Sequence, residues 1–182
     1  MPRASDYTPG PLLAAVYQTP AGPVGIVVDP HAAGDLGPAE YGAVVSSSFR
    51  GIDDALGHLI TSGRDVHPRS PVPFVAGVLA RYRDGDLDAL EEVSVSQPGG
   101  PFQQQAWRAM RTIRGGSIDT YAGLARRAGR PRAARAAGTV CASNLVAPFI
   151  PCHRIVASDG IGGYGYGLEI KIALLEHEGV LL

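Results

Sequence analysis

A polar stretch rich in glycine and proline, residues 94–101, divides this chain of 182 residues into two segments. Residues of these types at such density interrupt helices and strands, and the stretch resembles a linker. At this length the chain can form one good-sized core or two small ones. The hydrophobic fraction of 45% is that of an ordinary folded protein. We therefore expect two small domains, residues 1–95 and residues 101–182.

Charge is distributed unequally between the two segments. Residues 1–99 hold six Arg and twelve acidic residues, whereas residues 100–182 hold nine Arg, one Lys and five acidic residues. Between residues 108 and 154, nine Arg stand against the single Asp119. A local basic surface of this kind fits a polyanion such as nucleic acid. A solvated helix face is the other interpretation that charge alone allows.

Several classes of protein are disfavoured. The N-terminus lacks the basic start and apolar run of a signal peptide, and no apolar stretch is long enough to span a bilayer. We expect a cytoplasmic protein without a membrane partner. Its two cysteines, Cys141 and Cys152, are too few for a disulfide framework or a zinc site built from several cysteines. Either one, taken alone, is most simply a reduced, buried small residue.

The first segment has the pattern of a small α/β unit. Short apolar runs predict strands at residues 12–17, 24–28 and 41–46, and helical spacing predicts helices at residues 52–60 and 74–82. No phosphate-binding glycine loop, paired-carboxylate site or metal-ligand cluster is recognisable in it. His58 and His67 are better explained as structural or exposed residues than as ligands.

The second segment begins with a predicted helix. Pro101 can open it, and Gly115-Gly116 can end it. Its apolar stripe consists of Phe102, Ala106, Met110 and Ile113, with Trp107 also in the core.

Two further short helices are predicted at residues 121–128 and 132–142. Asp119 or Thr120 caps the first, and Gly129-Arg130-Pro131 separates the two. This spacing suggests a helix-turn-helix.

The second of these helices has a face made mostly of alanine. Ala133, Ala137 and Val140 lie on one side of it; Arg132, Arg135, Ala136 and Thr139 lie on another. Small side chains with a few Arg allow close approach to the floor of a DNA groove. A tightly packed internal helix is the alternative, but it would leave the two Arg in need of buried partners.

A candidate nucleophile follows in the string Pro151-Cys152-His153-Arg154. A thiol attacks carbon as the thiolate, and a nearby His or Arg can lower its pKa. Adjacent Cys and His side chains diverge, however, so we expect a bridging water or a second residue between them rather than a direct pair.

The ordered set of motifs is far more specific than Cys-His alone. Asn144 stands eight residues before the cysteine, preceded by Arg135-Ala136-Ala137-Gly138 and by the Tyr-Ala-Gly-Leu-Ala string at residues 121–125. From about residue 102 to 179 the chain resembles the O6-alkylguanine-DNA alkyltransferase family, also called methylated-DNA–protein-cysteine methyltransferases. The resemblance implies a ribonuclease-H-like α/β domain followed by a mostly helical domain with the helix-turn-helix and the cysteine.

The activity implied is stoichiometric, irreversible transfer of an alkyl group from O6-alkylguanine in double-stranded DNA to Cys152. Because O6 of a paired guanine faces its partner base, the nucleotide must first rotate out of the helix. The thioether formed is no leaving group, so no turnover is expected, and the reaction needs neither metal nor cofactor. The free protein should be monomeric.

The resemblance also assigns roles to residues. Cys152 accepts the alkyl group, His153 takes its proton through a water, Glu178 orients His153, and Asn144 braces the turn. Tyr121 donates toward the departing guanine, and Arg135 replaces the flipped nucleotide. The remaining assignments are DNA contacts at Arg130, Arg132, Ala136 and Thr139, and a substrate pocket formed with Tyr164, Tyr166 and Arg154.

This chain departs from the family pattern at several positions. Leu145 replaces the proline that commonly follows the Asn, and the link at residues 113–119 is unusual. The loop at residues 160–167 is one residue short. Tyr166 then either crowds the space beside the thiol and favours small adducts, or packs under the loop or faces solvent. Without a Cys before position 141, the N-terminal zinc site of some relatives cannot form.

Two other functions compete with repair. A non-catalytic sensor of alkylated guanine would lack the cysteine that is present here. A redox-responsive DNA-binding regulator would need Cys141 and Cys152 close enough to bridge, and it leaves Asn144, Tyr121 and Glu178 without a role.

Overall fold

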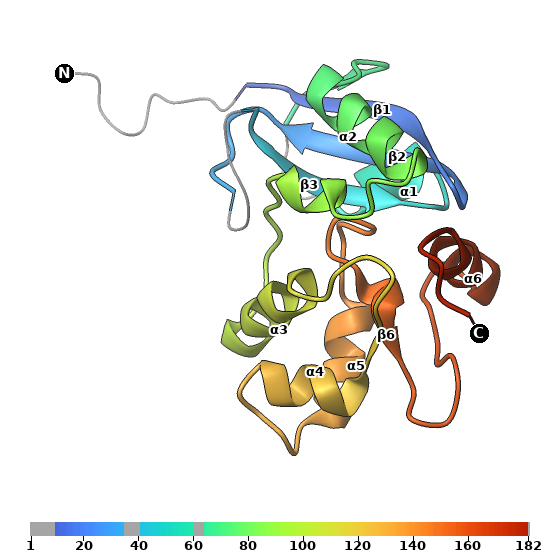
Figure 1. Ribbon diagram of the computed structural model, residues 1–182. Coiled ribbons are helices and arrows are strands. Elements are labelled where there is room, and N and C mark those ends of the chain that lie inside the picture. The colour runs from blue at the N-terminus through green and yellow to red at the C-terminus, as the bar shows by residue number, and fades with distance from the viewer. Residues whose placement is uncertain (1–9, 35–40, 60–63, 182) are drawn as a thin grey trace.

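The computed structural model describes residues 10–34, 41–59 and 64–181. A mixed α/β part formed by the N-terminal half lies over a mostly helical C-terminal part (Figure 1). The combination agrees with the expected fold class of α/β followed by α.

The N-terminal part is built on a four-stranded sheet with the order β3-β2-β1-β4. Its strands are β1 (Leu12–Thr19), β2 (Gly22–Asp29), β3 (Ala43–Ser48) and β4 (Val66–Pro68). β1 pairs antiparallel with β2 and parallel with β4, and β2 pairs antiparallel with β3. Gly22 closes the β1–β2 hairpin at φ +102°, a backbone region that favours glycine.

Two helices cover opposite faces of this sheet. Ile26 and Val28 belong to the main core together with Val78 of α2 (Pro73–Arg83). The intervening Val27 points the other way and packs with Ala55 of α1 (Ile52–Gly57). Successive side chains of a strand alternate between faces, so β2 can be apolar from Val24 to Val28 and still bury each of these residues.

The predicted elements of this half are confirmed with shifted ends. β3 begins two residues after residue 41, because Gly42 at φ +82° interrupts the extended chain. α1 ends at Gly57, before the predicted end at residue 60, which lies outside the described residues. His58 is exposed and contacts Ser46, and His67 is exposed on β4, as expected for residues that are not ligands.

The interpretation of residues 94–101 as a linker is wrong for its first half. The main chain of Ser94 and Ser96 makes hydrogen bonds of 2.9 Å to Val44 of β3, and Val95 is buried. The alternation of Val93 and Val95 extends the apolar face of the sheet, so burial outweighs the local preference for a loop. One core cluster then runs through both halves of the chain.

The C-terminal part contains α3 (Pro101–Arg111), β5 (Asp119–Thr120), α4 (Tyr121–Arg127), α5 (Ala134–Ala142), a 3-10 turn η4 (Cys152–Arg154), β6 (Ile155–Val156) and α6 (Leu168–His177). Thr120 caps α4, because its Oγ1 accepts the Gly123 amide at 3.0 Å. α3 ends before Gly115-Gly116, and α5 begins two residues later than predicted, which leaves Arg132 in the turn.

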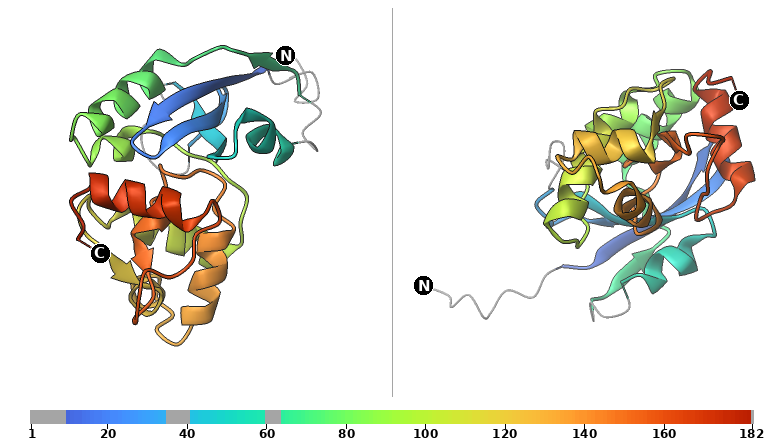
Figure 2. Two further views of the ribbon diagram at one scale, coloured as in Figure 1. Left: turned by 90° about the vertical axis from the view of Figure 1, so that its right-hand side faces the viewer. Right: turned by 90° about the horizontal axis from the view of Figure 1, so that it is seen from below.

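The last helix joins the two parts. α6 lies beneath the N-terminal sheet and its helices in Figure 2, and its C-terminal end contacts α2 through Tyr82 and Glu178. Among the described residues, none of the helices is long and apolar enough to cross a membrane.

Candidate active site

Cys152 begins η4 immediately after a fully buried apolar run. Val146 and Ile150 are inaccessible to solvent, so their burial draws the following residue into the interior, and Cys152 is 5% exposed. Asn144 Nδ2 donates to Ile150 O at 2.8 Å and to Cys152 Sγ at 3.1 Å. The Asn side chain thus ties the turn together and holds the sulfur.

The environment of the sulfur favours a neutral thiol. Burial raises the pKa of Cys152, because a low-dielectric interior disfavours the thiolate. The hydrogen bond from Asn144, the charge of Lys171 and the nearby Tyr164 hydroxyl lower that pKa in part. Cys152 is therefore a protonated nucleophile that needs a base.

His153 lies next in the chain and forms a buried pair with Glu178. Nε2 of His153 lies 2.9 Å from Glu178 Oε1, and both side chains are fully buried. A carboxylate only accepts, so Nε2 carries the proton and Nδ1 of neutral His153 keeps its lone pair. Nδ1 has no hydrogen-bond partner in the described parts of the chain.

Glu178 is held as a carboxylate. Burial alone raises the pKa of Glu178, but hydrogen bonds from His153 and Arg154, with their charges, bring it well below its usual range. Burial lowers the pKa of His153 despite the pairing with Glu178. The pair therefore rests as neutral imidazole and ionised carboxylate.

The assignment of Arg154 to the substrate pocket is wrong. Its side chain is 1% exposed and turned inward, where Nε and Nη2 each donate to Glu178 at 2.9 Å and Nη1 donates to Ile113 O at 2.6 Å. A guanidinium in the interior needs such partners. Arg154 anchors Glu178 and does not face the cavity.

A cavity of about 290 Å³ opens onto Cys152. Its lining comprises Tyr121, Gly138, Cys141, Ala142, Cys152, Gly163, Tyr164 and Gly165. The structure thus brings two predicted residues, Tyr121 of α4 and Tyr164 of the 160–167 loop, to one wall. Gly162 is at φ +72°, and a Cβ there would lie 3.1 Å from the Tyr121 hydroxyl, so glycine permits the loop to approach.

Tyr166 is placed differently from Tyr164. Its hydroxyl donates to Ser47 O of β3 at 3.0 Å, and its ring meets Phe49 edge to face at 5.5 Å. It lines a separate cavity of about 100 Å³ that also reaches Cys152. Tyr166 is thus held to β3 while its cavity reaches Cys152, so the choice between crowding the thiol and packing under the loop stays a prediction.

The predicted DNA contacts lie together on the surface around α5. Arg130, Arg132, Arg135, Ala136 and Thr139 are all exposed. The buried side of the helix carries Ala137 and Val140, in accordance with the predicted stripe. Gly138 and Ala142 of the same helix line the cavity at Cys152. One helix therefore carries the exposed Arg135 and also forms part of the cavity wall at the thiol.

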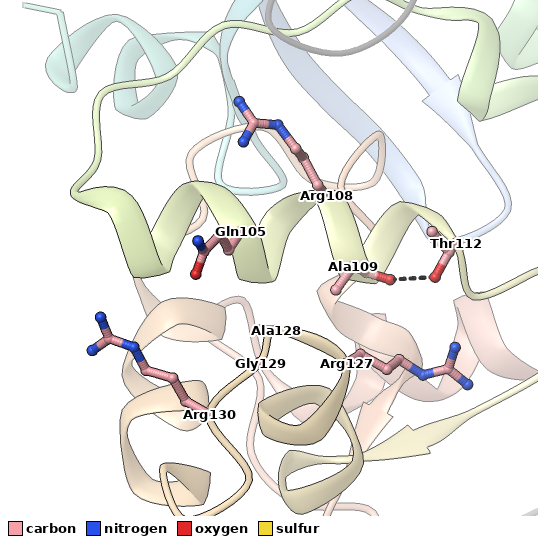
Figure 3. Close-up of a pocket in the computed structure, with 8 residues that line it drawn as sticks. All are labelled: Gln105, Arg108, Ala109, Thr112, Arg127, Ala128, Gly129 and Arg130. Atoms are coloured by element: carbon pink, nitrogen blue, oxygen red, sulfur yellow. Dashed lines mark hydrogen bonds between the residues drawn. The ribbon is translucent and has the colours of Figure 1, made fainter.

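A larger cavity of about 620 Å³ lies between α3 and the end of α4. The guanidinium groups of Arg108, Arg127 and Arg130 point in different directions around it (Figure 3). Arg127 is paired with Asp119 at 2.6 Å, and Arg130 lies over the Phe102 ring at 5.1 Å. Its lining holds no nucleophile, so the smaller cavity is the candidate reaction site.

Sequence reasoning overlooked two buried supports. Lys171 of α6 is fully buried and donates to the carbonyls of Ile155 and Ile161, each at 2.7 Å, which ties β6 to the 160–167 loop. Its being the single Lys of the chain was the available signal. Gln97, in the stretch interpreted as a linker, donates to Asn144 Oδ1 at 3.1 Å. Nothing in the sequence around Gln97 indicates this role.

No group of three or more His, Cys, Asp and Glu side chains arranged to hold a metal ion occurs among the described residues.

Comparison with known proteins relates the chain to one family. Residues 101–180 match the family model "6-O-methylguanine DNA methyltransferase, DNA binding domain". A methylated-DNA–protein-cysteine methyltransferase of Shigella flexneri is 40% identical over 105 residues, which cover 57% of this chain and 61% of that protein. This chain thus spans less than two thirds of that relative. One from Mycolicibacterium paratuberculosis is 32% identical over 151 residues, 71% of this chain and 91% of that protein.

Solved structures give the same relation over nearly the whole fold. The O6-methylguanine methyltransferase of Mycobacterium tuberculosis superposes with a TM-score of 0.68 at 26% identity, covering 92% of each chain. The enzyme of Pyrococcus kodakaraensis superposes with a TM-score of 0.61 at 27% identity, covering 93% of this chain and 99% of that one. On the extent of these matches and on the geometry around Cys152, the chain belongs to the methylated-DNA–protein-cysteine methyltransferase family.

Proposed function

We propose that this protein repairs O6-alkylguanine in double-stranded DNA by moving the alkyl group irreversibly to Cys152. The observation that carries the proposal is a buried thiol at a cavity whose rim is the Arg-bearing helix α5. A relative of known structure from Mycobacterium tuberculosis has been solved in complex with DNA, at 25% identity and a TM-score of 0.64. The same partner is proposed here.

The proton of the thiol is the first requirement of the reaction. Neutral His153 offers Nδ1 as the acceptor, because Glu178 holds the proton on Nε2. Neighbouring Cys and His side chains diverge, so one water between Sγ and Nδ1 carries the proton. The sulfur then bonds to the alkyl carbon as the carbon–O6 bond breaks, and the electron pair of that bond goes to guanine.

The departing base gains negative charge, which a nearby donor can stabilise. Tyr121 lines the cavity and is the donor that we assign to this role, with a proton ending on guanine. Arg135, exposed on α5, enters the duplex in place of the flipped nucleotide. Arg130 and Arg132 contact phosphates on either side, and Ala136 and Thr139 face the groove floor.

The architecture proposed for this task has two domains, residues 1–95 and residues 101–182. The strand order β3-β2-β1-β4, with three antiparallel strands and a parallel fourth, supports a ribonuclease-H-like shape for the first. α4 and α5, separated by residues 128–133, support a helix-turn-helix in the second. The protein acts as a monomer and without turnover.

Intact mass after incubation with a duplex containing O6-methylguanine tests the proposal. One molecule of protein should gain one methyl group, about 14 Da, on Cys152, because a thioether does not release it. Cys152→Ala should bind the duplex and gain nothing. Multiple turnovers, or label on Cys141, which lines the same cavity, would contradict the proposal.

A further inference from the structure

Glu178 receives a donor that comes from outside the C-terminal part. Tyr82, at the end of α2, is completely buried, and its hydroxyl donates to Glu178 Oε1 at 2.8 Å. Helical spacing explains the burial, because Val75, Val78, Leu79 and Tyr82 form one stripe. The same spacing would bury a Phe equally well, so it does not explain why the residue carries a hydroxyl.

The placement of Tyr82 is itself secured by α6. Nε2 of His177 donates to the Tyr82 carbonyl at 2.7 Å, and the two rings meet edge to face at 5.0 Å. His177 immediately precedes Glu178, so one turn of α6 holds both the backbone and the hydroxyl of Tyr82. A Phe at position 82 would keep both contacts with His177 and lose only the hydrogen bond to Glu178.

The hydroxyl competes with His153 for one oxygen. Oε1 of Glu178 accepts from Tyr82, from His153 Nε2 at 2.9 Å and from Arg154 Nη2 at 2.9 Å, whereas Oε2 accepts, among the described residues, only from Arg154 Nε. A carboxylate oxygen has about two lone-pair sites, so three donors share them. Each further donor to Oε1 weakens the hydrogen bond between Glu178 and the imidazole of His153.

We propose that Tyr82 is a positioning residue of the alkyl-transfer centre, which shares Glu178 Oε1 with His153 and so keeps His153 a neutral acceptor for the thiol proton. The inference rests on the proposed function. It gives the N-terminal part a task in the reaction: α2 supplies a hydrogen bond to the proton relay.

The charges around His153 act together with this hydroxyl. Glu178 favours the imidazolium, while burial and the positive charges of Arg154 and Lys171 oppose it. Tyr82 remains un-ionised, because burial and the Glu178 charge raise the pKa of its hydroxyl far above the usual range. Removing the hydroxyl strengthens the bond of Glu178 to His153, so His153 should become protonated at a higher pH.

The test measures the pH dependence of alkyl transfer from O6-benzylguanine as the free base, by intact mass, in the parent and in Tyr82→Phe. The rate should fall on the acid side as His153 takes up a proton, and in Tyr82→Phe that midpoint should lie roughly half to one pH unit higher. Tyr17→Phe is the matched control. Tyr17 is also buried with one hydrogen bond, from the Val72 amide at 2.8 Å, but it does not touch Glu178.

The outcomes separate the inference from the proposed function. A parent protein that takes no alkyl group refutes the function, and the ¹⁵N titration of His153 in parent and Tyr82→Phe still measures the shift without activity. A midpoint equal to that of the parent overturns the role of Tyr82, even if the rate falls uniformly. Should Tyr82→Phe not fold, His177→Phe keeps the ring contact and releases the Tyr82 backbone. Its midpoint should move the same way by less, and an unmoved midpoint overturns the inference.

Discussion

Cys152 combines two properties that pull in opposite directions. Burial keeps the sulfur from solvent and raises the pKa of the thiol. The hydrogen bond from Asn144 and the charge of Lys171 lower that pKa in part. The second thiol of the cavity, Cys141, has burial as the main cause of a raised pKa, and the Asn144 side chain donates to the sulfur of Cys152 instead. The hydrogen bond from Asn144 and the neighbouring His153 therefore distinguish the two cysteines as nucleophiles.

At the same scale, Tyr166 should affect the loop more than the choice of adduct. Tyr166→Phe removes the hydrogen bond to Ser47 O and leaves the ring beside Phe49. We expect the free energy of unfolding in urea to fall by about 1 kcal/mol. The ratio of second-order rates for O6-methylguanine and O6-benzylguanine should stay as in the parent.

Tyr164→Phe is the comparison, because Tyr164 lines the cavity at Cys152. If the ratio of rates changed in Tyr166→Phe and not in Tyr164→Phe, Tyr166 would be the residue that limits adduct size.

Helix α5 has different requirements on each of its sides. Its buried side is Ala137 and Val140, its exposed side carries Arg135 and Ala136, and Gly138 lines the cavity. Ala136, Ala137 and Gly138 leave little side-chain bulk between the helix and its neighbours, and the proposed function uses this for close approach to a DNA groove. The turn before α5 holds Arg130 and Arg132. The sequence predicts a helix from Arg132, whereas α5 begins at Ala134, a difference of two residues that is usual at helix ends.

Arg135→Ala should slow repair of a duplex far more than reaction with the free base. Flipping costs a few kcal/mol, and only the duplex requires it, so a loss of roughly tenfold or more is expected on the duplex alone. Single-turnover rates on both substrates measure the effect. Equal losses would exclude Arg135 from flipping. In the control Arg132→Ala, the slope of log binding constant against log salt should decrease by about 0.9 for one lost phosphate contact.

For the molecule as a whole, the buried site makes stability depend on pH. Burial holds the pKa of folded His153 below its ordinary value, so below about pH 6.5 the unfolded chain binds a proton that the folded chain refuses. Glu178 adds to the effect, because its folded pKa is also lowered and its contribution is lost as the pH falls below about 4.3. Both groups therefore destabilise the fold on acidification.

Urea unfolding between pH 7.5 and 5 measures the first effect. The free energy of unfolding of the parent should fall with the pH, by at most about 1.4 kcal/mol per unit for one proton. His153→Gln should reduce that slope, whereas His67→Gln, at an exposed position of β4, should retain it. A slope that His153→Gln leaves intact would mean that another group controls acid unfolding.

The sequence alone determined those features that depend on local periodicity and on an ordered motif. Short apolar runs specified β1 and β2, and Thr120 with Gly129 set the limits of α4. The string around Cys152, read with Asn144 and Glu178, identified the family and four residues that the fold brings together in two contacts, Asn144 with Cys152 and His153 with Glu178.

Tertiary structure alone decided which side chains support the site, because those contacts join residues far apart in the chain. The sequence assigns Arg154 to the substrate pocket, yet the hydrogen bond to Glu178, 24 positions away, holds its side chain in the interior. Tyr82 and Glu178 are separated by 96 positions, and Gln97 and Asn144 by 47. The local sequence pattern predicts which residues are buried. It does not predict the hydrogen-bond partner of a buried polar group, because that partner depends on how α2, α6 and residues 94–97 pack together.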